Sequence, residues 1–207
     1  MLTGFFAAIH PILARAGVQL VERAREQIGV TTSYDPAYRK LAYPGGDVSK
    51  ETGVCSDVVV RAFRGLNIDL QKEVHEDMTA AFDQYPRKWG LTRPDPNIDH
   101  RRVPNLMTYF KRKGWSVSQS TTASDFRAGD VVAWDLGGGV THIGVVSDRK
   151  STKGTPLVIH NIGQGVQEED ILFRYEFIGH YRPQLDSRKR ARPIARGCEI
   201  IVNCSST

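Results

Sequence analysis

The sequence predicts an α+β fold in which N-terminal helices pack on a mainly antiparallel β-sheet. Up to Gly114, apolar residues recur at helical spacing in several segments. After Gly114 the pattern changes to alternation with β-branched residues, which is typical of strands. Helices first and a sheet second favour α+β over an alternating α/β order. The 207 residues, 40% of them hydrophobic, are enough for one well-buried core.

Four helices are expected in the first half of the chain, and the first two show apolar residues at helical spacing. Gly29 and Gly65 follow the first two of them as natural C-terminal stops. The segments between, rich in proline and other turn formers, are expected to be ordered loops. The predicted helices span Leu13 to Ile28, Cys55 to Arg64, Asp69 to Phe82 and Leu106 to Lys113.

Five strands are expected in the second half. A polar loop, residues 148–154, suits the connection between two neighbouring antiparallel strands. The predicted strands span Asp130 to Trp134, Thr141 to Ser147, Pro156 to His160, Ile171 to Phe173 and Phe177 to Tyr181.

The charge distribution argues against a nucleic-acid-binding domain. The net charge is +5, but from Arg182 onward there are six basic and two acidic side chains, so the preceding residues carry only +1. A folded nucleic-acid surface would need basic residues in the body of the chain. We expect residues 184–207 to be a disordered basic tail, with contact to anionic polymers or lipids as the alternative.

The amino terminus has two readings. A short apolar stretch followed by Ala14-Arg15-Ala16 is typical of an exported protein, so residues 1–23 read as a signal remnant and the start of the first helix. Against export, no basic residue precedes the stretch and His10-Pro11 interrupts it. No apolar run approaches the roughly 20 residues that a membrane span requires. The domain itself is expected over residues 24–183.

Cys55 is the first candidate for chemistry. It lies at the start of a predicted helix, where unpaired amides and the helix dipole stabilise an anion. We therefore expect a depressed thiol pKa and a more nucleophilic sulfur. The alternative is a small buried hydrophobe at a helix start.

Two histidines in neighbouring predicted strands supply a partner. If Ser147 pairs with Thr155, then His142 falls directly opposite His160 and both side chains project from one face. A one-residue slip would separate them. We expect Cys55 to act as nucleophile, His142 as general base and acid, and His160 as the residue that orients it.

These motifs resemble a known family. GVCSDVV, GDVVAWDLGGGVTHIGVVSD and PLVIHNIG resemble the cysteine, histidine and third-residue motifs of NlpC-like peptidases. With TTSYDPAYRKLAYPGGDV, HEDM and RPDPNIDHRRVPNL, they are similar to a bacterial envelope family that carries a domain-of-unknown-function label. The resemblance implies a papain-like fold, export, and Cys55, His142 and His160 as the catalytic set. The implied activity is a cysteine peptidase or amidase acting on peptidoglycan stem peptides, in the periplasm or outside the cell, without a cofactor.

The pattern departs from NlpC-like peptidases around the cysteine, where Val54 replaces Asp and Asp57 replaces Gly. Tyr34, Asp57 and Arg101 are the substrate-binding candidates. Asp57 could bind a substrate amine, or favour the helix start as an acid in its first turn. Arg101 could clamp a carboxylate, or be a solvated loop arginine.

Three other functions remain open on the sequence. An acyltransferase would use the same three residues and the same thioester. A zinc protein would use His142 and His160 with His180 or Cys55, although no compact ligand spacing supports it and we expect no metal. A catalytically silent wall-binding module would keep the fold alone. An inhibitor or immunity protein as a partner is also left open.

Overall fold

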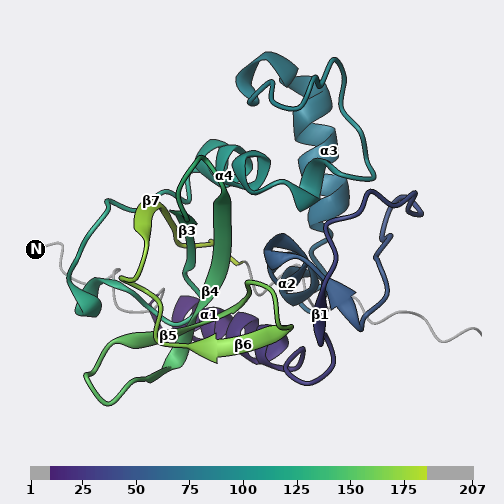
Figure 1. Cartoon of the computed structure of the whole chain (residues 1–207). Helices are drawn as coiled ribbons and strands as arrows, with labels where there is room; N and C mark the ends of the chain where they lie inside the picture. The colour runs from purple at the N-terminus through teal and green to yellow at the C-terminus, as the bar shows by residue number, and fades with distance from the viewer. Residues whose placement is uncertain (1–9, 186–207) are drawn as a thin grey trace, which may run out of the picture.

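The computed structural model describes residues 10–185, and the fold is α+β as predicted (Figure 1). The α-helices are α1 (His10–Arg25), α2 (Cys55–Arg64), α3 (Leu70–Ala80) and α4 (Val103–Arg112), and short 3-10 helices span Phe82–Gln84, Asp99–Arg101 and Ala123–Asp125. The strands are β1 (Ser33–Tyr34), β2 (Thr52–Gly53), β3 (Val131–Asp135), β4 (Thr141–Lys150), β5 (Pro156–Asn161), β6 (Val166–Glu169) and β7 (Glu176–Tyr181).

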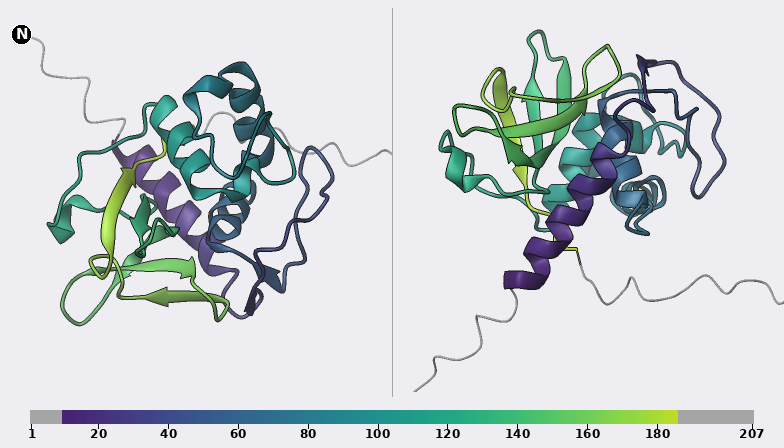
Figure 2. Two further views of the ribbon diagram at one scale, coloured as in Figure 1. Left: turned by 45° about the horizontal axis from the view of Figure 1, so that its top comes forward. Right: turned by 90° about the horizontal axis from the view of Figure 1, so that it is seen from below.

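The large sheet has five antiparallel strands in the order β6-β5-β4-β3-β7. α1 and α2 pack against its centre at β4, and the two views of Figure 2 show α1 lying across the strands. β1 and β2 form a separate parallel pair next to α2. The cysteine at the start of α2 is thereby held against the central strands.

The pleat of the sheet separates two apolar clusters. Ala133, Ile143 and Ile159 belong to the larger cluster, together with the apolar faces of the α-helices. Trp134 and Val158 belong to a smaller cluster on the other face, which Phe126 and residues 171–172 cover. Alternate residues of β3, β4 and β5 thus serve different faces, as expected for strands.

Several predicted boundaries are wrong. α1 ends at Arg25 rather than Ile28, and α4 begins at Val103 because Pro104, which fits a first helical turn, lies at its start. The predicted strand Ile171–Phe173 is wrong: residues 172–174 form a turn, in which Ile171 and Leu172 are buried against the smaller apolar cluster.

Two strands were missed. β6 holds one apolar residue in four, because it is an edge strand with little to bury. The β1–β2 pair falls in a segment expected to be loop, and each strand has only two residues.

No described helix is long and apolar enough to cross a membrane. Residues 1–9 of the predicted signal segment, and residues 186–207 of the predicted basic tail, lie outside the described residues.

Candidate active site

Cys55 is the first residue of α2 and is buried, with 4% of its surface exposed. The Asp57 carboxylate accepts a hydrogen bond of 2.7 Å from the Val54 backbone N–H, which fixes the entry into the helix. The backbone amide of Ile143 on β4 lies close to the thiol and favours its ionised form. The cysteine therefore faces the strand that carries His142, one residue before Ile143.

The predicted depression of the thiol pKa is wrong. Burial raises the pKa of Cys55 to about 12, and the negative charge of Asp57 adds to this effect. The amides of Ile143, Ser56 and Cys55 itself act in the opposite direction but are outweighed. Desolvation thus dominates over the helix start, and the resting group is a neutral thiol.

His142 and His160 meet, although not in the predicted register. Val145 pairs with Ile159 and Val146 with Val158, so His160 lies across from Gly144. His142 precedes Gly144 by two residues on β4, so the two histidines are diagonal neighbours. A shift of two residues keeps both rings on one face of the sheet. Ser147 does not pair with Thr155 because β4 continues to Lys150, with a register irregularity after Val146.

Gly144 makes this diagonal contact compatible with the packing. A Cβ at Gly144 would lie 2.6 Å from Cγ1 of Val158 and 3.2 Å from Cβ of His160. A side chain at this position would therefore push the β5 strand away and separate the two histidines.

The two imidazoles form a buried pair. Nε2 of His142 lies 3.0 Å from Nδ1 of His160, and the rings are nearly perpendicular, at 86°. Trp134 stacks on His142 with ring centroids 5.7 Å apart. Burial, with the neighbouring His160, lowers the pKa of His142 to about 3, and burial also lowers the pKa of His160. The resting pair is neutral.

The contact with His160 occupies Nε2 of His142 and leaves its Nδ1 as the other ring nitrogen. Within residues 10–185, no hydrogen bond occupies this Nδ1 and none joins His142 to Cys55. The structure thus brings the two histidines together and places the cysteine at the adjacent backbone amide.

Asp57 and Arg101 contact each other. Nε and Nη2 of Arg101 donate to the two Asp57 carboxylate oxygens, each at 3.0 Å, and both residues are almost fully buried. The same guanidinium also donates to the backbone oxygens of Asp35 and Ala37. Through these contacts, Arg101 holds the 35–37 loop against α2. A substrate that bound Asp57 or Arg101 would have to displace one of these partners.

Tyr34 lies on β1 beside the cysteine and is 40% exposed. Burial raises the pKa of its phenol to about 12, with further contributions from the neighbouring Cys55 and Asp57 groups. Of the three predicted substrate-binding residues, Tyr34 is therefore the one that is partly exposed and lies next to the thiol.

Asn161 was missed by the sequence reasoning, although it directly follows His160 in the PLVIHNIG motif. Its side-chain amide donates to the backbone oxygens of Ser33, at 3.2 Å, and Gly53, at 3.0 Å. These bonds connect the end of β5 to β1, which contains Tyr34, and to β2, which lies just before Cys55. Its position beside a candidate histidine was the only signal available from the sequence.

Of the residues proposed for zinc, His180 lies apart from the histidine pair. His180 lies on β7, across from Val132, and its Nε2 is 2.7 Å from Oδ2 of Asp130. Across the described part of the chain, no three His, Cys, Asp or Glu residues are arranged to hold a metal ion. The His142–His160 pair therefore has no third ligand within the described residues.

These features define an α+β protein in which a helix-start cysteine is set against a sheet that carries a buried histidine pair. The chain belongs to the family described as Domain of unknown function (DUF1287), which matches residues 21–183. It is 58% identical to the "Uncharacterized protein YijF" of Escherichia coli (strain K12) over 171 residues, 83% of each chain. The family membership predicted from the motifs is confirmed.

Two solved structures from Trichomonas vaginalis, NlpC1 and NlpC2, are also similar. Their TM-scores are 0.43 and 0.42, at 15% and 16% identity, over 81% and 79% of this chain. This chain spans 44% and 46% of theirs, less than half their length.

Proposed function

We propose that this protein is a cysteine hydrolase, a peptidase or amidase that cleaves amide bonds in peptidoglycan stem peptides in the bacterial cell envelope. The observation that carries the proposal is the placement of the Cys55 thiol at the amide that follows His142, while His160 engages the far nitrogen of His142. A nucleophile, a base and an orienting group are the parts that acyl transfer through a thioester needs.

The neutral resting groups favour proton transfer during the attack rather than a stored ion pair. As Sγ of Cys55 bonds to the substrate carbonyl carbon, its proton passes to Nδ1 of His142. His142 then gives the proton to the leaving amine as the carbon–nitrogen bond breaks, which leaves a thioester. Water attacks the thioester, again through His142, and the carboxylic acid and the thiol are released.

The absence of a direct thiol–imidazole hydrogen bond in the described residues is compatible with this role. Catalytic hydrogen bonds are often long in a free enzyme and tighten when substrate excludes water. The backbone N–H of Cys55 and the Tyr34 hydroxyl, both close to the thiol, are the candidate donors to the developing oxyanion.

The test is digestion of purified peptidoglycan, with products identified by mass spectrometry. The wild-type protein should release new stem-peptide fragments, and Cys55→Ala should release none while its melting temperature changes little. Cys198→Ala removes a cysteine outside the described residues and is the matched control; it should behave as wild type. Fragments released equally by Cys55→Ala would contradict the thiol mechanism. Products that carry an added amine, when one is supplied, would indicate acyl transfer instead.

A further inference from the structure

Glu169 on β6 lies on the same face of the sheet as the histidine pair. Gln167 pairs with His160 and Glu169 pairs with Val158, so residues 167 and 169 follow the face of His160. Oε2 of Glu169 lies 3.0 Å from Nε2 of His160. The two atoms are in charge contact, but within the described residues this Nε2 has no hydrogen-bond partner.

The proposed mechanism requires a particular position for each ring proton in the row formed by His142, His160 and Glu169. If Nδ1 of His142 accepts the thiol proton, its Nε2 must carry a hydrogen and donate to Nδ1 of His160. His160 must then carry its own hydrogen on Nε2, the atom beside Glu169. A carboxylate accepts hydrogen bonds and cannot donate one when ionised, so it favours this tautomer over the alternative.

We propose that Glu169 is a positioning residue that sets the tautomer of His160 and, through it, that of His142. This inference rests on the proposed function for its catalytic consequence, but not for the tautomer itself. In the row His142, His160 and Glu169, a hydrogen bond joins the two rings, and the carboxylate charge lies beside Nε2 of His160.

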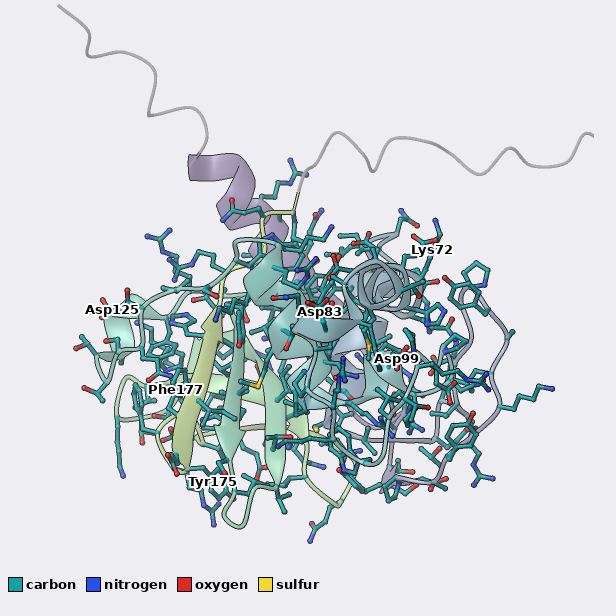
Figure 3. All side chains as sticks on the ribbon, turned by 90° about the horizontal axis from the view of Figure 1, so that it is seen from above. Lys72, Asp83, Asp99, Asp125, Tyr175 and Phe177 are labelled. Carbon is teal, nitrogen blue, oxygen red and sulfur yellow. The ribbon has the colours of Figure 1, made fainter. Side chains whose placement is uncertain are left out.

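The far end of the row opens into a cavity of about 560 Å³, lined by His160, Glu169, Arg174, Tyr175 and residues 162–165. In Figure 3, Tyr175 lies on the sheet side of the molecule, away from Asp99 and Lys72 on the helical side. The Glu169 side chain is 45% exposed, whereas that of His160 is 1% exposed. The titratable and charged groups around His160 are thus His142 from β4, Glu169 from β6, and Arg174 and Tyr175 from the following loop.

The negative charge of Glu169 also stabilises a proton on the histidine pair. Burial lowers the pKa of His160, and Glu169 counters this by favouring its protonated form. When His142 takes the thiol proton, the positive charge on the pair lies near a carboxylate instead of in an uncompensated buried site.

The first test does not depend on turnover. Two-bond proton–nitrogen NMR spectra of the imidazoles at pH 7 report which ring nitrogen carries the hydrogen, and His160→Asn assigns the His160 signals. In the wild-type protein His160 should carry it on Nε2. In Glu169→Gln the amide can also donate to this nitrogen, so the Nδ1–H tautomer should become populated. Glu169→Asp, which keeps the charge, should lie between the two.

The second test measures cleavage of soluble muropeptides prepared from purified peptidoglycan. Glu169→Gln should lower kcat about threefold to tenfold and leave KM unchanged, since the affected step is proton transfer and the exposed carboxylate is partly screened by water. Asp170→Asn is the control: it removes the same charge from the next, exposed residue and should keep wild-type kcat and tautomers.

An unchanged His160 tautomer in Glu169→Gln would overturn the proposal. A rise in KM with unchanged kcat would also overturn it, because Glu169 would then contact substrate. An equal loss of kcat in Asp170→Asn would assign the effect to overall charge. If the wild-type protein cleaves nothing, the proposed function fails, and the NMR comparison still decides the role of Glu169.

Discussion

Two equally buried histidines on the same sheet have very different partners. His142 and His180 are each 2% exposed, and they lie on the same face, on either side of β3. His180 lies 2.7 Å from the Asp130 carboxylate, and Arg182 donates to both oxygens of this carboxylate at 2.8 Å. His142 contacts another histidine instead.

The difference is one of charge compensation. Burial raises the pKa of Asp130, but the hydrogen bonds from His180 and Arg182 outweigh it and hold this pKa below its usual range. The Asp130 site therefore carries a stable ionised group that fastens β7 to β3. The His142–His160 pair has lowered pKa values, so the resting pair is neutral, and Nδ1 of His142 is unoccupied within the described residues. A complete ion pair favours a structural role, and a neutral base with an unoccupied nitrogen favours chemistry.

The largest effect is expected from removing each histidine in turn: His142→Ala should reduce cleavage but not stability, and His180→Ala should reduce stability but not cleavage. His142→Ala should reduce peptidoglycan cleavage about 10²- to 10⁴-fold, the range for loss of a general base, with little change in melting temperature. His180→Ala should instead lower the free energy of unfolding by about 1–3 kcal/mol, because it leaves part of Asp130 unpaired, and should retain cleavage. Digestion assays and thermal melts of both variants would check this; strong cleavage by His142→Ala would refute the contrast.

A milder change within the histidine pair should sharpen the assignment of roles. In His160→Asn the amide oxygen can still accept the hydrogen on Nε2 of His142, so orientation is partly kept. We expect a loss on the order of tenfold in turnover, equivalent to about one hydrogen bond. The measurement is the rate of muropeptide cleavage beside that of His142→Ala. Equal and complete losses in both would point to a shared ligand role instead.

The smallest effect concerns the pH dependence of stability. The folded-state pKa of Asp130 lies below its unfolded value, so its contribution is complete above about pH 4 and is lost as the pH falls through the folded pKa. The difference in unfolding free energy between wild type and Asp130→Asn should therefore narrow below about pH 4, by at most about 1.4 kcal/mol per pH unit. Denaturant unfolding from pH 7 to pH 3 measures it.

The histidine pair should respond over a different range. The folded-state pKa of His142 is lowered to about 3, so the unfolded chain takes up its proton first and stability falls as the pH drops from about 6.5. His142→Asn should remove this part of the slope. A wild-type stability that is flat between pH 6.5 and pH 4 would argue against a buried neutral histidine.

Much of the fold followed from local patterns. The helix Cys55–Arg64 was predicted with its observed bounds, because an apolar stripe and a terminal glycine define it within ten residues. β3 and β5 were predicted to within one residue at each end, because their centres are continuous apolar runs. Edge strand β6 was not, since its polar residues carry no strand signal.

The sequence by itself determined the chemical inventory: a helix-start cysteine, and two histidines on neighbouring strands with side chains on one face. Only the tertiary structure decided the diagonal register at Gly144, the Asp57–Arg101 contact and the approach of Glu169 to His160. It also decided the sign of the thiol pKa, because the helix start is a local property and desolvation is not. Strand register and burial arise from contacts between residues far apart in the chain, which local sequence patterns do not encode.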